Sequence, residues 1–384
     1  PADLDDFKNC VDSFNEAHRS SYFYLDVIEE LVNAKILKHD KNEISFYNKT
    51  YLSFFVAKWI NRKIQNGSGI DQLKNVVNNL CYNINADILL FLTYITENIS
   101  VLYQILFSEQ EYTKTYKELN IDKNDISILT ESIAPFIPMK LPDTAEKNKL
   151  NAKEVELEKR YFENEDIKRI NIYDEELDVF EVQQRRLLKY LDLITKILPC
   201  FAHLLETKQQ DDFIKEIYRL PNKIAYFLFQ PLEENKEALI EELKHFFNKN
   251  HPNKELSDDE IKVLLSRLLT NMLLTLYDIA ARNCSSDRTI LALDSFDYKS
   301  NTCYYIQNIM MHENLRKFNQ YVERSDELFD NTDSEYVKLI LRKIFRKHCL
   351  DNTVLYRGEG QKYIDKYLGC KNIVALRLTH SKKD

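Results

Sequence analysis

Apolar residues recur at helical spacing along most of the chain, and one short region near the N-terminus breaks this pattern. Helices are predicted over residues 4–17, 22–33 and 48–64. Between the last two, the apolar pieces Ile36-Leu37-Lys38 and Ile44-Ser45-Phe46 flank the polar turn His39-Asp40-Lys41-Asn42, which predicts a β-hairpin. Helices followed by a small hairpin predict a winged-helix-like domain over residues 1–66.

The next stretch, residues 67–150, is predicted to be a helical domain followed by a connector. Short apolar helices are expected over 70–80, 86–96 and 99–107, joined by polar turns. Because Pro135, Pro138 and Pro142 interrupt residues 108–149, we expect a connector there with one short helix at 126–133.

Residues 151–384 are predicted to form an irregular array of helices. A charge-dense stretch at 150–176 is typical of a solvated helix or linker, and a helical block begins near Asp178. Further helices are predicted at 211–219, 222–229, 234–248, 257–281, 287–294, 302–311, 315–329, 334–349 and 361–368, followed by an apolar stretch at 373–376. Ser257 and Glu260 have the spacing of a capping box. The expected fold class is therefore mostly α: a winged-helix-like N-terminal unit with a small β-hairpin, then an irregular α-helical array.

Glycine is scarce, since the 384 residues include only Gly67, Gly69, Gly358, Gly360 and Gly369. Phosphate-binding loops need glycine because their backbone N–H groups approach the anion closely and some of their residues take positive φ. Neither close glycine pair forms GxxxxGK[ST] or GxGxxG between a strand and a helix. We therefore expect no cofactor in this chain, and neither ATP hydrolysis nor tight ATP binding by it.

Composition restricts the partners and the compartment. The net charge of −8 argues against non-specific nucleic-acid binding, which needs a basic surface. The seven cysteines include no CxxC pair, which favours reduced, mostly buried thiols. The longest apolar run, at 88–95, is shorter than the roughly 18–20 residues of a membrane span, and we expect no signal peptide. A cytoplasmic protein without a membrane partner is expected, and the start at Pro1-Ala2-Asp3 fits a fragment of a larger one.

Candidate catalytic groups are isolated from one another. His312-Glu313 lacks a second histidine at HExxH spacing and His348-Cys349 is a single adjacent pair, so no metal site is predicted. Ser68, between two glycines, is interpreted as part of a turn, and the pairs Glu29-Glu30 and Glu233-Glu234 as solvated faces. The chain is therefore expected not to be an enzyme.

Aromatic and basic residues interleave between Tyr47 and Trp59, a pattern that can stack nucleic-acid bases. Packing in and around one helix is the preferred interpretation. It covers Phe46, Tyr51, Phe54, Phe55, Ala57 and Trp59.

This stretch resembles the winged-helix end of STAND ATPases, the prokaryotic relatives of NACHT and NB-ARC (NLR-like) immune receptors. After Leu31-Val32-Asn33-Ala34-Lys35-Ile36-Leu37, Phe46 starts and Phe54-Phe55-Val56-Ala57 closes a pattern close to the family's F-x-H/Y-x-x-x-x-x-[FY]-F-x-A. Residues 78–93 are similar to a segment that follows this winged helix in bacterial STAND proteins. The recognisable motifs cover residues 25–107.

The resemblance also suggests one site residue. In many relatives a histidine two residues after the phenylalanine senses the phosphates of ADP, and Asn48 occupies this position here. Its amide can donate a hydrogen bond to phosphate although it carries no charge. The alternative is that Asn48 caps the helix that follows it.

The resemblance implies separate roles for the different parts of a longer protein. An effector and an ATPase core, with ATP or ADP and Mg²⁺, would lie upstream, and the winged helix would transmit the ATPase state. Residues 151–384 would be a sensor array that binds an invader-derived protein, as in anti-phage defence, before the receptor self-associates. Two alternatives stay open. One is a helical scaffold or adaptor for protein–protein interaction unrelated to an ATPase, and the other is an enzyme whose site is built from distant carboxylates.

Overall fold

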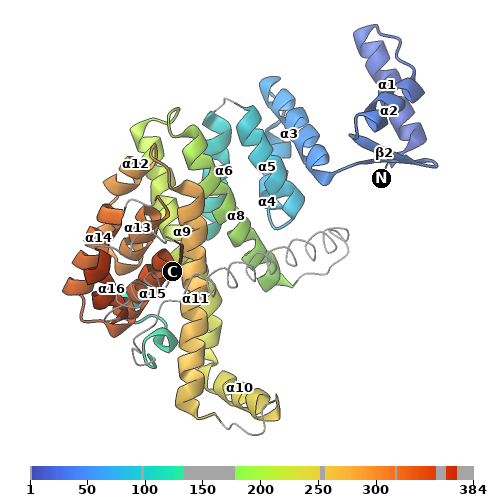
Figure 1. The fold of residues 1–384 in the computed structure, drawn as a ribbon. Coiled ribbons are helices and arrows are strands. Elements are labelled where there is room, and N and C mark those ends of the chain that lie inside the picture. The colour runs from blue at the N-terminus through green and yellow to red at the C-terminus, as the bar shows by residue number, and fades with distance from the viewer. Residues whose placement is uncertain are drawn as a thin grey trace, which may run out of the picture. The chain divides into compact units, whose positions relative to one another are not determined.

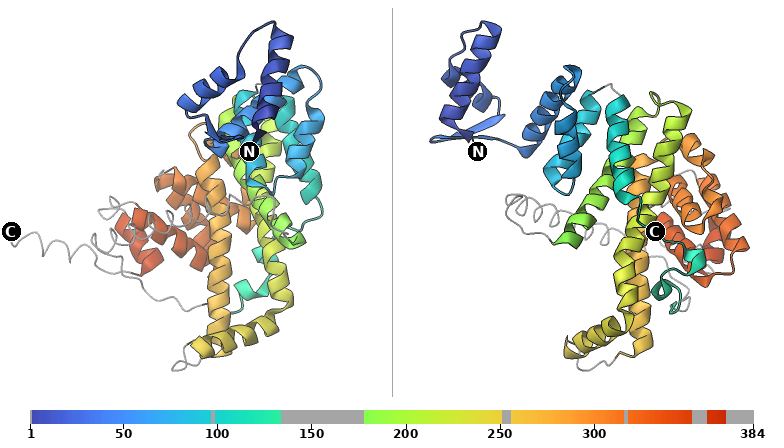
Figure 2. Two further views of the ribbon diagram at one scale, coloured as in Figure 1. Left: turned by 90° about the vertical axis from the view of Figure 1, so that its right-hand side faces the viewer. Right: turned by 180° about the vertical axis from the view of Figure 1, so that it is seen from behind.

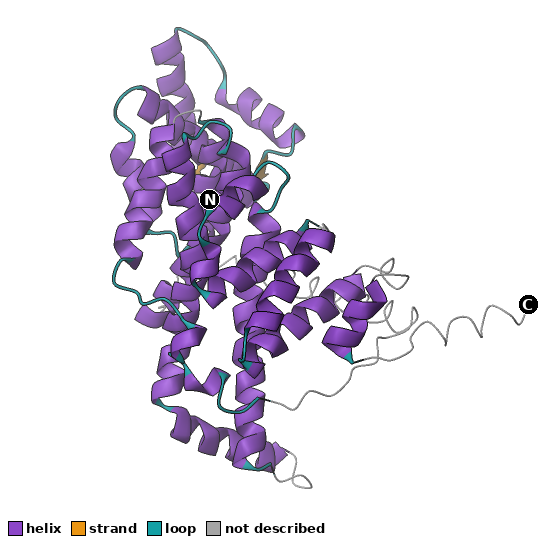
Figure 3. Ribbon diagram, turned by 90° about the vertical axis from the view of Figure 1, so that its left-hand side faces the viewer, coloured by secondary structure: helices purple, strands orange, loops and turns teal. Residues whose placement is uncertain are grey.

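The computed structural model describes residues 2–96, 99–133, 178–250, 256–315, 318–351 and 360–369. Helices dominate these residues, and three short strands near the N-terminus form the one sheet found among them (Figure 3). The predicted fold class is confirmed. The connector beyond residue 133, the charged stretch at 150–176 and the apolar stretch at 373–376 lie outside the described residues.

Contacts divide the chain into two compact units, whose elements are labelled in Figure 1. Unit 1 comprises Pro1–Glu111 with Phe180–Leu193, and unit 2 comprises Tyr112–Val179 with Ile194–Asp384. The division into domains 1–66, 67–150 and 151–384 stays a prediction.

Unit 1 begins with a small antiparallel sheet of strand order β1-β3-β2. The predicted hairpin is confirmed: β2 (Leu37–Asp40) pairs with β3 (Glu43–Phe46), and Leu37 lies opposite Phe46. Lys41, in the turn, has a φ of 55°, in the left-handed region. The two-residue strand β1 (Ala2–Asp3) was not predicted, because two residues are too few to show an alternation of apolar and polar positions.

Two helices cover this sheet. They are α1 (Leu4–His18) and α2 (Tyr24–Asn33), close to the predicted ranges. Ile28 of α2 packs with Leu37 and Ile44 of the hairpin in a small core, which Phe7 of α1 and Phe46 of β3 extend. The predicted sequence of helices and hairpin therefore encloses its own apolar cluster.

The rest of unit 1 is helical. It contains α3 (Lys49–Gln65), α4 (Ile70–Asn78), α5 (Asn83–Ile95), α6 (Ile99–Thr113) without its last two residues, and Phe180–Leu193 of α8 (Val179–Phe201). Gly69, between α3 and α4, is required for close approach, since a Cβ atom there would lie 2.5 Å from the backbone nitrogen of Ile64. α3 packs on α5, which holds α3 in place along one side.

Unit 2 consists of helices and short 3-10 turns. Its elements are η1 (Ile121–Lys123), η2 (Ser127–Leu129), the last part of α8, α9 (Thr207–Glu234), α10 (Lys236–Asn250), α11 (Asp258–Cys284), α12 (Ile290–Ser295), η4 (Tyr298–Ser300), α13 (Thr302–Asn314), α14 (Phe318–Asn331), α15 (Glu335–Asp351) and α16 (Gly360–Leu368). α9 and α11 lie side by side, and α12 to α16, in orange and red, gather beside α11 (Figures 1 and 2). Within this group α13 is central, since all its residues from 305 to 313 are buried.

The helices predicted separately at 211–219 and 222–229 are one helix, α9, so that prediction was wrong. Pro221 lies inside α9 although proline costs about 3 kcal/mol in a helix interior. Pro221 is itself buried, and α9 packs against α11, α12 and α13. This packing outweighs the local tendency to break. Beside Pro221, Asn222 Nδ2 and Gln307 Nε2 both donate to the Tyr218 carbonyl, at 2.9 and 3.0 Å.

Two other predicted helices were too long. Tertiary hydrogen bonds hold the first segment, and a local side-chain turn precedes the second helix. The helix expected at 126–133 is the single turn η2, where the Ile128 N–H donates to Glu233 of α9 and Ser266 Oγ of α11 donates to the Leu129 carbonyl, each at 2.9 Å. The helix expected from 287 starts at Ile290 in α12, because Ser286 and Thr289 form a side-chain-bonded turn before it.

α11 is the one helix among the described residues with the length and apolarity of a membrane span, at a mean hydropathy of 1.3 over an 18-residue window. A core helix of a soluble protein meets the same criterion. α11 packs against α9, α10 and α13 and buries Leu269, Leu273 and Tyr277 completely. The fold is therefore compatible with a soluble protein. As predicted, Ser257 and Glu260 form a capping box at its start.

Candidate functional site

Helix α3 presents an exposed aromatic face. Residues four positions apart lie on the same side of a helix, and Tyr51, Phe55 and Trp59 have this spacing. Their exposed fractions are 38%, 39% and 49%, and that of Tyr47, four residues earlier, is 52%. Exposed aromatic side chains in a continuous row are typical of a binding surface, whereas single exposed apolar residues are common anywhere.

The opposite side of α3 is the packed one. Ser53, Ala57 and Ile60 are buried there, and the ring of Phe54 meets Phe91 of α5 edge-on, with 5.8 Å between centroids. The ring of Phe55 also stacks on that of Phe46 of β3, with 5.8 Å between the ring centroids. The exposed row is therefore carried by a helix that is fixed on two sides.

Basic residues accompany the aromatic row. α3 contains Lys49, Lys58, Arg62 and Lys63 and no acidic residue. Lys63 Nζ lies 5.7 Å from the centroid of the Trp59 ring, and Lys38 Nζ lies 4.7 Å from that of Tyr47, both within cation–π distance. We call this surface the α3 face and define it as Tyr47, Tyr51, Phe55, Lys58, Trp59 and Arg62.

The interpretation of these aromatic residues as core was wrong for three of the six positions. Ala57 is buried and Phe46 and Phe54 are half-buried, but Tyr51, Phe55 and Trp59 are exposed. The signal was present, because apolar residues around α3 occupy more than the roughly 100° stripe that one packing partner covers. The sequence pattern shows which residues share a face of α3, but does not tell which face the partner helix covers.

Asn48, the candidate nucleotide-sensing residue, is the N-cap of α3. Its Oδ1 accepts a hydrogen bond of 2.9 Å from the Thr50 N–H, and its backbone is extended, with φ −135° and ψ 138°. The side chain is exposed and adjoins Tyr47 at the start of the α3 face. Because capping uses the oxygen of the amide, the NH₂ group is the part that could donate to a phosphate. The cap is thus found, and phosphate sensing stays a prediction.

Substitutions of Asn48 separate these two roles. Asn48→Ala is expected to lower the free energy of unfolding of unit 1 by about 1 kcal/mol, because the cap is lost. Asn48→Ser retains a capping oxygen and should cost much less, but it removes the amide donors. Urea unfolding followed by the fluorescence of Trp59, the chain's only tryptophan, measures both variants. Equal stability of wild type and Asn48→Ala would contradict the capping role.

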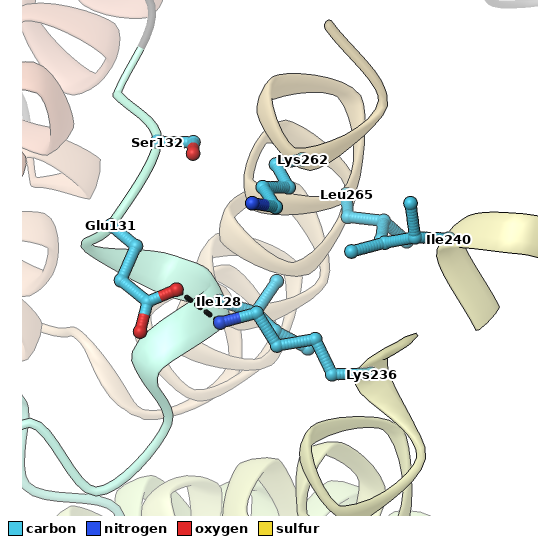
Figure 4. Close-up of a pocket in the computed structure, with 7 residues that line it drawn as sticks. All are labelled: Ile128, Glu131, Ser132, Lys236, Ile240, Lys262 and Leu265. Carbon is cyan, nitrogen blue, oxygen red and sulfur yellow. Dashed lines mark hydrogen bonds and ion pairs between the residues drawn. The ribbon is translucent and has the colours of Figure 1, made fainter. Parts of the chain in front are cut away.

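Unit 2 contains a small hollow that is lined in part by an ion pair. Seven residues from the region of η2, α10 and α11 line it, and it encloses no space for even a water molecule (Figure 4). Lys236 forms an ion pair with Glu131 and lies 3.0 Å from Ser127 Oγ. The hydrogen bond from Lys236 holds the pKa of Glu131 below its usual value. The ion pair of Lys236 and Glu131 therefore connects α10 to the residues that follow η2.

The adjacent residues His312 and Glu313 bind different partners, as expected for neighbours on a helix. His312 Nε2 donates to Asp294 Oδ1 at 2.9 Å, whereas His348 Nδ1 lies 3.0 Å from Glu313 Oε1. Asp294 also accepts from Asn308 Nδ2 at 3.0 Å and from Arg324 at 2.9 Å. These contacts connect α12, α13 and α14, and the sequence analysis did not predict them.

Other groups considered as catalytic have structural surroundings. Ser68 Oγ donates to the Lys63 carbonyl at the end of α3, and Glu233 binds η2. Burial raises the pKa of the Cys284 and Cys303 thiols to about 12, so neither is a thiolate at neutral pH. Within the described parts of the chain, no three His, Cys, Asp or Glu side chains are grouped as metal ligands would be.

Comparisons with protein-family models, with curated proteins and with solved structures find no match to this chain. The resemblance to STAND ATPases therefore depends on the motifs within residues 25–107 alone.

Proposed function

We propose that this chain is the regulatory and ligand-sensing C-terminal region of a bacterial STAND ATPase, a cytoplasmic, NLR-like receptor of anti-phage defence. In this proposal the winged-helix-like unit transmits the state of an ATPase core that lies upstream. The helical array binds an invader-derived protein and controls self-association of the receptor. The chain itself carries no catalytic role.

The α3 face is the observation that supports this proposal most. It lies within the region of resemblance, directly after Asn48, and it combines Tyr, Trp and Arg, the residues most enriched at the energetic centres of protein interfaces. A winged helix that converts the state of an ATPase into self-association of the receptor needs such a contact surface. Sensing further requires that the trigger binds one receptor state more tightly than the other, because equal affinity shifts no equilibrium.

A helical scaffold or adaptor is the alternative, since an exposed aromatic face suits any protein partner. The two proposals differ in what precedes Pro1 in the natural gene. Walker A and Walker B motifs upstream would support the receptor, and a gene that encodes no ATPase domain there would contradict it.

The receptor proposal predicts a complete loss of response when the array is removed. In the intact receptor, deletion of residues 180–384 should abolish activation by phage infection, because the sensor would be lost, whereas the isolated chain should show no ATP turnover. Growth of infected cells and a phosphate-release assay measure the two results. Activation without residues 180–384 would place the sensor elsewhere, and turnover by pure chain would contradict the assignment as a non-enzyme.

A further inference from the structure

Unit 1 exposes a second apolar surface, at the start of α2. Tyr22, Phe23 and Leu25 have exposed fractions of 60%, 55% and 41%, and the exposed Phe14 ring of α1 lies 6.2 Å from that of Tyr22. In contrast to α3, α2 is acidic: Asp26, Glu29 and Glu30 are all exposed and the helix has no basic residue. We call this surface the α2 face and define it as Phe14, Tyr22, Phe23, Leu25, Asp26 and Glu29.

The two faces are complementary in charge and alike in apolar character. Leu25 and Glu29 are four residues apart, so an apolar and an acidic side chain share one side of α2. On α3, Lys58 follows Phe55 and Arg62 follows Trp59 by three residues, so basic and aromatic side chains also share one side of that helix. Opposite charges around apolar centres favour association of the correct pair and disfavour each face pairing with itself.

Within one copy the two faces do not cover each other. Both are exposed, and only Tyr47 and Asn48 separate β3 from α3, with Phe46 already stacked on Phe55. A second copy of the chain supplies what each face lacks, an apolar surface of opposite charge.

We propose that the α2 face of one copy docks on the α3 face of another. The proposal deepens the self-association in the proposed function, and it depends on that function only for its place in an activated receptor. Because the two surfaces differ, a single contact between two copies leaves one face of each kind available. When these free faces bind further copies, rings or open chains form, and when they bind each other, a closed two-fold dimer forms.

Trp59 provides a direct test, because the chain's single tryptophan lies in the proposed interface. For the whole chain, raising the concentration at about 0.1 M salt should produce species larger than the monomer in sedimentation velocity, with a shift of Trp59 emission to shorter wavelength. At about 1 M salt, where charges act over about 3 Å instead of about 10 Å, both signals should weaken strongly. A chain that stays monomeric at all concentrations would overturn the proposal.

Reversing the charges of the α3 face in one variant and of the α2 face in another tests whether these two faces contact each other between copies. The α3 variant Lys58→Glu/Arg62→Glu and the α2 variant Asp26→Lys/Glu29→Lys should each associate about tenfold or more weakly than wild type. Mixed together they should associate again in alternating order, because the intact α2 face of the first binds the intact α3 face of the second and the two charge-reversed faces are again opposite in sign. The matched control is Lys74→Glu on the exposed side of α4, which should associate like wild type.

Recovery on mixing also shows that both variants are folded, and circular dichroism of each checks this independently. Three results would overturn the proposal. The folded variants could fail to associate on mixing, or they could associate as tightly as wild type. The third is a chain that stays monomeric and shifts its Trp59 emission to shorter wavelength only when a nucleic acid is added. The association experiment uses this chain alone, without an ATPase. Its result therefore does not depend on whether the intact receptor responds to phage.

Discussion

Replacing Lys223 with methionine is expected to destabilise unit 2 by about 3–5 kcal/mol, because it leaves a buried carboxylate without its counter-ion. Lys223 and Glu216 lie on α9 with side chains only 4% and 2% exposed, and Nζ is 3.4 Å from Glu216 Oε1. Lys223 also donates to Thr113 Oγ1 at 3.1 Å, which connects α9 to the end of α6. Urea unfolding followed by circular dichroism measures the loss, and Trp59 fluorescence reports unit 1 separately.

The double variant Glu216→Leu/Lys223→Met should be much more stable than the single one, since replacing both members of a buried ion pair by apolar residues is often close to neutral. The matched control is Lys215→Met, on an exposed position of the same helix, which should change stability by less than about 0.5 kcal/mol. The single variant Glu216→Leu completes the comparison. If its loss of stability and that of Lys223→Met simply add in the double variant, the two residues are not coupled and the interpretation fails.

Removing the charge of Asp294 is expected to be the second largest effect, about 1.5–3 kcal/mol of unit 2 stability in Asp294→Asn. The carboxylate accepts hydrogen bonds from His312, Asn308 and Arg324. Partial burial raises the pKa of Asp294, but the bonds from His312 and Asn308 and the charge of Arg324 outweigh burial and place the pKa below its ordinary value. An amide in its place keeps the shape and brings an NH₂ group towards donors.

The lowered pKa of Asp294 determines how its contribution to the stability of unit 2 depends on pH. Because the pKa of Asp294 is lower in the folded chain than in the unfolded one, its contribution is fully present above the unfolded value, about 4, and is lost as the pH falls through the folded value. The stability difference between wild type and Asp294→Asn should therefore shrink as the pH falls below about 4. Asp297→Asn, a nearby exposed carboxylate, is the control and should show little difference at any pH. A difference that persists at low pH would mean that the ionised carboxylate contributes nothing.

Much of unit 1 could be predicted because its signals are local. Alternation around a polar turn is enough to predict the hairpin of β2 and β3, and helical periodicity predicted α1 and α3 to within one residue at each end. The capping box at Ser257 likewise depends only on residues three positions apart.

The errors fall where distant residues compensate a local preference. Pro221 would end a helix in isolation, but it is buried in α9, whose packing partners α11, α12 and α13 lie later in the chain. The single turn η2 is held through its Ile128 N–H, which donates to Glu233, about one hundred residues later in the chain. No window of local sequence contains both partners of such a bond.

For the candidate site, too, some features could be predicted from the sequence and others could not. The amino-acid sequence by itself determined that Tyr51, Phe55 and Trp59 share one side of a helix, and that Asn48 stands where a cap is needed, because both follow from the 3.6-residue repeat and from nearest neighbours. Only the tertiary structure decided that α5 covers the other side of α3, so that the aromatic row stays exposed. It also decided that Glu216, Lys223 and His312 are buried with their partners and that Asp294 is partly buried. Burial depends on which elements meet, and that is settled by the summed packing of the whole fold and not by any local run of residues.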